Sequence, residues 1–166
     1  MNLMKAESPG PSVSKLVPKV QSTAKILYTI YIILTIVEII FLLIGKMPLF
    51  DTLCLSFGTA GTGGFGVKND SIASYSTYNQ VVITVFMILF GINFNAYYLL
   101  LTKKVMQAAK NEEVRYYLGI IGLAIVAIAI NTREMFTSFG SAFQQAAFQV
   151  GSIITTTGYA TTDFNV

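Results

Sequence analysis

The sequence predicts an all-α membrane protein in which one structural unit is repeated: a long helix, a short re-entrant helix, a glycine-rich loop and a second long helix. Three observations support this fold class. The composition is 54% hydrophobic and only 11% charged, with a mean hydropathy of +0.63, whereas soluble domains carry about a quarter charged residues. Long apolar runs alternate with short ones along the chain. A loop rich in glycine and threonine follows each short run.

Residues 1–23 form a polar leader rich in proline, serine and lysine. The leader lacks the apolar core of a signal peptide, and we expect it to lie in the cytoplasm. The first long apolar run, 24–45, holds about 22 residues, or roughly 33 Å of helix, which is enough to span a bilayer. Its interior charge is Glu38. Acids inside a membrane are usually functional or paired, and a structural role, hydrogen-bonded between helices or reaching the outer interface, is favoured here over ion coupling.

The next apolar run, 49–60, has about 12 residues and is too short to cross a membrane. The loop Gly61–Gly66 follows it, and a second long apolar run occupies 78–101. We therefore interpret residues 24–104 as one complete unit.

A charged connector, residues 105–115, links this unit to a third apolar run, 116–130. Because that run is marginal in length, its helix is expected to begin inside the connector and to keep its charged ends in water. A second short run, 136–154, and a second loop, Thr155–Ala160, complete the pattern. Residues 116–166 are thus predicted to be an incomplete second unit.

The two loops match each other position by position. The aligned pairs are Thr62 with Thr156, Gly64 with Gly158, and Phe65 with Tyr159. Because the order of the helices repeats together with the loops, the sequence indicates an internal repeat of about 94 residues.

The basic residues predict which side of the membrane each segment faces. If the short runs enter the membrane and return without crossing, eight of the eleven basic residues share the side of the N-terminus and the connector. These eight are Lys5, Lys15, Lys19, Lys25, Lys103, Lys104, Lys110 and Arg115. Basic residues concentrate on the cytoplasmic side, so the N-terminus and connector are expected to be cytoplasmic and the short runs re-entrant. The same distribution accounts for the net charge of +3, and no nucleic-acid partner is expected.

The residue types of the loops suit a filter for a dehydrated cation. Irregular backbone at membrane depth is tolerated where it is buried in protein or lines water. Glycine lets successive carbonyls point one way, and carbonyl oxygens can replace the water around an ion. The short helices, Leu49–Thr59 and Phe139–Ile154, would then be pore helices whose negative dipole ends face the ion. In this potassium-channel-like arrangement, threonine hydroxyls add oxygens, and Phe65 and Tyr159 are expected to be wedges that hold the loops open.

Other interpretations of these residues compete with the filter. Gly61–Gly66 fits G-x-G-x-x-G, but the residues after it lack the helix and the acid of a dinucleotide site. Both loops could instead be flexible extracellular turns.

Asn93 and Asn95 are expected to bond between helices, and Cys54 is expected to pack within its helix. With no histidine and one cysteine, the chain can build no zinc site, dithiol pair or histidine-based catalytic set, so neither an enzyme nor a covalent cofactor is expected.

Four segments carry a resemblance to a known family. They are Ala6–Pro11, Leu49–Cys54, Ala60–Phe65 and Ser152–Phe164. Together they resemble the bacterial Trk/Ktr potassium-uptake transporters, in particular the TrkH type, and the resemblance covers essentially the whole chain. It implies potassium uptake through a pore in the inner membrane, formed by four such units of one polypeptide. The chain resembles the second unit and the first half of the third, an internal fragment without the first unit, the fourth unit and the gate-bearing helix.

The resemblance also implies a site and partners. The implied potassium ligands, mainly through backbone carbonyls, are Thr62, Gly63, Gly64, Thr156, Thr157 and Gly158. Potassium is the substrate. The implied partners are membrane lipid, the remaining pore units of the full-length chain, a second copy of the full-length protein in a homodimer, and a cytoplasmic nucleotide-binding regulatory subunit.

Two other functions stay open at the level of sequence. The chain could be a subunit of an oligomeric potassium channel, or a non-transport membrane assembly protein whose glycine-rich loops are turns. The loops are unequal, since Thr62-Gly63 stands opposite Thr156-Thr157. That inequality favours unlike units within one polypeptide over identical subunits around a pore.

Overall fold

The computed structural model describes residues 20–101 and 105–161, which form helices joined by loops. The helices are α2 (Val20–Ile44), α3 (Leu49–Ala60), α4 (Thr77–Phe90), α5 (Phe94–Leu101), α6 (Val105–Ala109), α7 (Glu112–Asn131), the short 3-10 helix η1 (Arg133–Met135) and α8 (Phe139–Ile154). The expectations for the leader up to residue 19, for Lys103 and Lys104, and for the chain from residue 162 onward fall outside the described residues.

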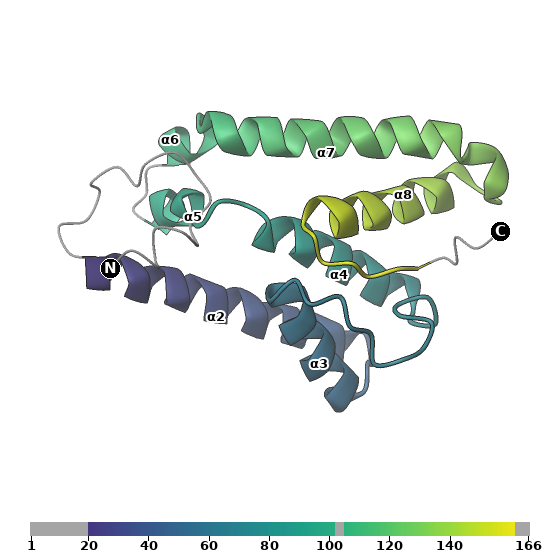
Figure 1. Ribbon diagram of the computed structural model, residues 1–166, viewed down its shortest axis with the longest axis horizontal. Helices are drawn as coiled ribbons and strands as arrows, with labels where there is room; N and C mark the ends of the chain where they lie inside the picture. Colours follow the sequence, from purple (N-terminus) through teal and green to yellow (C-terminus); the bar gives the residue numbers. More distant parts are fainter. Residues whose placement is uncertain (1–19, 102–104, 162–166) are drawn as a thin grey trace.

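Within the described residues, two helices are long and apolar enough to cross a membrane, and the bent pair α4 and α5 would make a third span if it acts as one. The two long helices are the Ala24–Ile44 part of α2, with a mean hydropathy of 2.6, and α7, with 1.8. In Figure 1, α2 and α7 lie at opposite edges of the bundle, and α4 and α8 lie between them. The expected start of α7 inside the connector is confirmed, because the Asn111 side chain accepts a hydrogen bond from the Glu113 N–H at 3.1 Å. Asparagine is a preferred residue for this capping position.

The second long apolar run differs from its prediction, because it is not one continuous helix. It is divided into α4 and α5, which meet at 88° across a break at residues 91–93. A methyl group on Gly91 would collide with the Tyr117 hydroxyl of α7, so glycine permits that close approach. Beyond the break, the Asn93 side chain accepts a hydrogen bond from the Asn95 N–H at 2.9 Å and starts the new helix.

Two backbone carbonyls near the break accept hydrogen bonds from tyrosine side chains. The Tyr97 hydroxyl donates to the Leu89 carbonyl at 2.7 Å, and the Tyr117 hydroxyl donates to the Ile88 carbonyl at 3.2 Å. Kinks in helices have identifiable causes, and unsatisfied backbone groups are costly at membrane depth. The bend therefore depends on the missing side chain of Gly91, on the Asn93 cap, and on tyrosines of α5 and α7.

The two short helices confirm the predicted pore-helix segments as helices. α3 starts directly after Pro48 and ends at Ala60, one residue beyond the expected end. α8 has the predicted bounds, and a capping box between Ser138 and Ser141 fixes its first turn. Both helices are shorter than the roughly 20 residues that a transmembrane helix needs.

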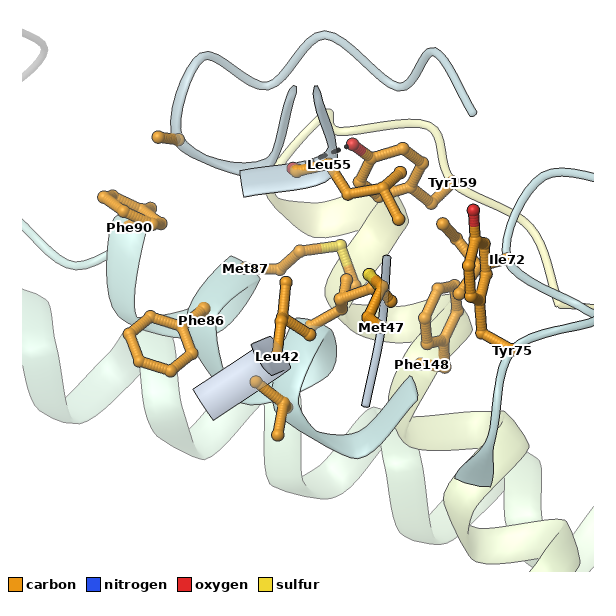
Figure 2. Packing of buried hydrophobic residues seen from close by; sticks show 13 residues of the cluster. Leu42, Met47, Leu55, Ile72, Tyr75, Phe86, Met87, Phe90, Phe148 and Tyr159 are labelled. Atoms are coloured by element: carbon orange, nitrogen blue, oxygen red, sulfur yellow. Dashed lines mark hydrogen bonds between the residues drawn. The ribbon is translucent and has the colours of Figure 1, made fainter. Parts of the chain in front are cut away.

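One hydrophobic cluster joins the two predicted units. Figure 2 shows Leu42 of α2, Leu55 of α3 and Met87 of α4 packed together with Phe148 of α8 and Tyr159 of the second loop. A second cluster, built around Ile121, Ile125, Ala129, Ala146 and Val150, joins α7 to α8. Because α8 belongs to both clusters, the position of the second loop relative to α3 and the first loop is fixed by packing.

Candidate functional site

The two loops leave their short helices through the same backbone hydrogen bonds. In the first, the N–H groups of Gly61, Thr62 and Gly63 donate to the carbonyls of Phe57, Thr59 and Gly58 at 2.9, 3.3 and 2.7 Å. In the second, the N–H groups of Thr155, Thr156 and Thr157 donate to the carbonyls of Gly151, Ile153 and Ser152 at 3.1, 3.1 and 2.9 Å. These three bonds of the first loop thus each have a counterpart in the second, which has one more, from the Gly158 N–H to the Ser152 carbonyl at 3.3 Å.

The backbone angles of the loops repeat as well. Thr62 and Thr156 have φ values of 51° and 59°, and Gly64 and Gly158 have φ values of 69° and 86°. Glycine adopts this left-handed region freely, whereas threonine does so at a cost of order 1–3 kcal/mol. Strained backbone that occurs at matching positions in two loops indicates that the loop shape is selected for a function rather than for local stability.

The two loops approach each other at their glycines. A methyl group on Gly64 would collide with the Thr157 carbonyl oxygen and would lie 3.2 Å from the Gly158 Cα atom. The structure therefore brings together Gly64, Thr157 and Gly158 of the six predicted ligands. The remaining three, Thr62, Gly63 and Thr156, are exposed on the described part of the chain.

The Thr157 hydroxyl forms a hydrogen bond within its own loop. Its side chain is buried, and its oxygen lies 2.8 Å from that of Thr155. Because the Thr155 hydroxyl donates to the Gly151 carbonyl at 2.7 Å, its lone pairs are left to accept from Thr157. The bond braces the loop, and the Thr157 hydroxyl oxygen keeps its own lone pairs.

The second loop is anchored on the first unit. The Tyr159 hydroxyl donates to the Leu55 carbonyl of α3 at 3.1 Å (Figure 2), and the Ser152 hydroxyl donates to the Tyr159 carbonyl at 2.6 Å. The Ala160 carbonyl accepts from the Ile72 N–H at 3.0 Å. A methyl group on Gly58 would occupy the place of the Tyr159 hydroxyl, so glycine in α3 makes room for this anchor.

The two aromatic residues that were expected to be wedges behave differently. Tyr159 is 1% exposed and is inserted against α3, as a wedge should be. Phe65 is 86% exposed and wedges nothing among the described residues, so its expected role is not found. The reason is positional: Tyr159 packs on α3, and the described residues contain no short helix before α3 on which Phe65 could pack in the same way.

A polar network supports the loops from the segment after the first loop. The Tyr75 hydroxyl donates to the Asp51 carboxylate at 2.8 Å. Burial, assisted by this hydrogen bond, raises the pKa of Tyr75 well above its ordinary value. The ammonium group of Lys68 lies 4.3 Å from the centre of the Tyr75 ring, a cation–π contact. The segment after the first loop is thereby held to the start of α3.

Sequence reasoning missed Gln80, which organises this network. Its amide nitrogen lies within 3.3 Å of the carbonyl oxygens of Ile72, Ala73 and Tyr75. Its side-chain oxygen accepts from Gln144 of α8 at 3.0 Å. A usable signal was present, because each glutamine is a polar residue inside an apolar run, where such residues usually bond between helices.

The structure also places the other polar residues that the sequence singled out. Asn93 donates to the Glu113 carboxylate at 2.9 Å, which confirms the expected bonding between helices. Asn95 uses its backbone N–H to cap α5. Cys54 is partly buried in α3, where packing was expected. Glu38 is fully buried, and neither of its carboxyl oxygens has a hydrogen-bond partner within the described ranges.

Comparisons with known proteins assign the chain to a family. Residues 1–122 match the family described as TrkH, cation transport protein. The chain belongs to the TrkH family of cation transport proteins. This is a family of transporters and not of enzymes, and the chain is a membrane protein.

Individual relatives agree with this assignment. The Trk system potassium uptake protein TrkH of Vibrio parahaemolyticus is 34% identical over 99% of this chain and 35% of its own length. TrkG of Escherichia coli is 31% identical over 98% of this chain and 34% of its own length. The crystal structure of the potassium transporter TrkH from Vibrio parahaemolyticus superimposes with a TM-score of 0.83 at 30% identity, covering 96% of this chain and 36% of that one. The chain thus spans about a third of the length of its TrkH-family relatives.

Proposed function

We propose that this chain forms two neighbouring walls of a potassium-selective pathway and takes part in potassium uptake across the bacterial inner membrane. The observation that carries the proposal is the meeting of two equivalent loops, Gly64 against the Thr157 carbonyl, at the ends of two short helices. The TrkH relatives, whose names describe potassium uptake, support potassium as the substrate.

In this proposal the loops remove water from the ion and replace it with backbone oxygens. The coordinating residues are Thr62, Gly63, Gly64, Thr156, Thr157 and Gly158. A pore must compensate an ion for its lost hydration, and carbonyl dipoles do so without charged side chains. The C-terminal ends of α3 and α8 lie directly behind the loops, and the negative ends of their dipoles favour a cation.

The proposed topology makes both short helices re-entrant. Residues 24–104 would be a complete unit and 116–166 the first part of another, with the leader 1–23 and the connector 105–115 in the cytoplasm. Exposed apolar side chains on α2 and α7, such as Ile36 and Leu123, would face lipid. The other walls would come from further pore units of a longer polypeptide. A homodimeric assembly and a cytoplasmic nucleotide-binding regulatory subunit belong to the same proposal.

A glycine substitution tests the proposed filter. The test protein is a chimera in which this chain replaces the matched third of Vibrio parahaemolyticus TrkH. Gly64→Ala introduces a methyl group into the Thr157 carbonyl at a positive φ, whereas a methyl group on Gly119 of α7 would meet open space. Uptake of potassium and sodium into proteoliposomes should show lost discrimination for Gly64→Ala and unchanged discrimination for Gly119→Ala. Equal discrimination in a folded Gly64→Ala protein would exclude the filter.

A further inference from the structure

Ser71 connects the segment after the first loop to the end of the second loop. The Ala160 N–H donates to the Ser71 hydroxyl oxygen at 3.2 Å, and the Ile72 N–H donates to the Ala160 carbonyl at 3.0 Å. Two consecutive residues of one segment therefore bind both backbone groups of Ala160. Because Ala160 follows Gly158 by two residues and ends the second loop, these bonds hold the second loop where it leaves the site.

The backbone of Ser71 has a conformation that its residue type disfavours. Its φ value is 56°, in the left-handed region that glycine adopts freely and serine adopts at a cost. An antiparallel bridge between Lys68 and Ser71 closes the turn, with the Ser71 N–H donating to the Lys68 carbonyl at 3.0 Å. Glycine would form a turn of this shape more easily. Serine at this position therefore indicates that the hydroxyl has a role of its own.

Ser71 also packs against the end of the first loop. A methyl group on Gly66 would lie 2.8 Å from the Ser71 Cα atom, which is closer than carbon atoms pack. Gly66 is the last residue of the first loop, Gly61–Gly66. A continuous line of contacts thus runs from the first loop through Ser71 to Ala160 of the second.

The segment that carries Ser71 is supported by buried contacts. Ile72 is 0% exposed and belongs to the same hydrophobic cluster as Tyr75 and Tyr159, as Figure 2 shows. The Gln80 amide nitrogen lies within 3.3 Å of the carbonyl oxygens of Ile72 and Tyr75. A side chain can position its partner precisely when its own backbone is held by packing and hydrogen bonds. The Ser71 hydroxyl meets this condition.

We propose that Ser71 is a positioning residue of the filter, whose hydroxyl holds Ala160 and so sets the distance of the second loop from the first. This inference rests on the proposed function. Discrimination between ions depends on how the carbonyl oxygens of a filter are arranged, and the two loops meet where Gly64 approaches the Thr157 carbonyl. Without the hydroxyl, the Ala160 N–H is released and the second loop shifts relative to the first. Ser71 therefore acts on selectivity through the second loop and not as an ion ligand.

Three substitutions in the chimera separate the role of the hydroxyl from that of the turn. Ser71→Ala removes the acceptor, Ser71→Gly removes it while favouring the backbone turn, and Ser71→Thr keeps it. Threonine is compatible with the conformation, because Thr62 and Thr156 have φ values of 51° and 59°. We expect Ser71→Ala and Ser71→Gly each to lower the potassium-over-sodium uptake ratio about fivefold, the factor that one hydrogen bond is worth. Ser71→Thr should keep the ratio of the unsubstituted chimera.

Ser74→Ala is the matched control. Ser74 is exposed in the same segment, and its hydroxyl accepts from the Lys68 ammonium group at 3.1 Å and donates to the Asp70 carboxylate at 3.4 Å. Because both partners lie in the segment itself, Ser74→Ala should leave the uptake ratio unchanged. If Ser71→Ala does not fold, Ser71→Gly decides the question, because it keeps the turn.

Each contrary result has a distinct meaning. A fully selective Ser71→Gly chimera would overturn the proposal, because Ser71 would then serve the turn alone. An equal loss of selectivity in Ser74→Ala or in Ser71→Thr would overturn it as well. If the unsubstituted chimera takes up no potassium, the proposed function fails by itself.

Hydrogen exchange of the Ala160 amide, measured on this chain in detergent micelles, then tests the positioning contact without transport. Exchange should accelerate in Ser71→Gly, because the amide loses its acceptor, and should stay unchanged in Ser74→Ala. Unchanged exchange in Ser71→Gly would overturn the proposal.

Discussion

Replacing Tyr159 by phenylalanine removes the hydroxyl that ties the second loop to α3 and leaves the ring in place. The Leu55 carbonyl loses the Tyr159 donor at 3.1 Å but keeps the Thr59 hydroxyl at 2.8 Å. No unsatisfied carbonyl remains, so the loss is that of one hydrogen bond. Such bonds contribute about 1 kcal/mol in water-soluble proteins and about 0.6 kcal/mol between membrane helices. We therefore expect Tyr159→Phe to lower the free energy of unfolding by about 0.5–1 kcal/mol.

Truncating the ring has a larger expected effect. Tyr159 is 1% exposed, and Tyr159→Ala should lower the free energy of unfolding by about 3–5 kcal/mol, because it leaves a cavity. The matched control is Phe65→Ala at the aligned position. Phe65 is 86% exposed in the described chain, and surface substitutions usually change stability by less than about 0.5 kcal/mol.

Equilibrium unfolding measures the three variants. The protein should be this chain purified in detergent micelles, because the rest of a complete transporter would cover Phe65 in our proposal. The expected order of destabilisation is Tyr159→Ala, then Tyr159→Phe, then Phe65→Ala. Equal destabilisation by Phe65→Ala and Tyr159→Ala would refute the conclusion that only the second loop is seated on a pore helix within this chain.

Three further predictions concern the surroundings of the loops. Tyr75→Phe should lower the free energy of unfolding by an amount that is constant below about pH 10 and that shrinks above it. Above that pH the tyrosine ionises in the unfolded chain, while burial and the bond to Asp51 raise its pKa and keep it neutral in the folded chain. Unfolding measured between pH 7 and 11 checks this. Gly91→Ala should destabilise the protein by about 1–3 kcal/mol, because the methyl group collides with Tyr117, and the same unfolding measurement at neutral pH checks it. Gln80→Leu should cost about 2 kcal/mol, because several carbonyls lose their donor, and proteolysis between α3 and α4 should accelerate.

Much of the fold was predictable because hydrophobic run length and capping residues determine helix bounds. α8 starts after its capping residue Ser138 and ends where the short apolar run does, and α7 begins at the acidic turn after Asn111. The matching of Thr62 with Thr156 and of Gly64 with Gly158 was also legible, and the positive φ values repeat at those positions. Local chemistry was sufficient for these features.

The features that were not predicted depend on contacts distant in sequence. The break between α4 and α5 arises where Gly91 meets Tyr117 of α7. A run of apolar residues does not disclose that encounter, so the sequence indicated a single helix. The different exposures of Phe65 and Tyr159 also depend on a distant contact. The two aligned side chains are chemically alike, but Tyr159 packs on α3, a short helix that precedes it in the chain.

The side-chain roles within the loops were the least predictable. The Thr157 hydroxyl bonds to that of Thr155, a contact within the loop that the residue types alone did not indicate. Whether a threonine oxygen faces the pathway or the helix behind it depends on a single side-chain rotation. Periodicity and composition do not determine that rotation.

A crystal structure of the chimera in rubidium or thallium would test the central claim most directly. Both ions substitute for potassium and are located by anomalous scattering. The proposal predicts an ion peak beside the backbone carbonyls of Gly64 and Thr157, close to the point where the loops meet. An ion found only at carboxylate side chains, with no peak along either loop, would contradict it.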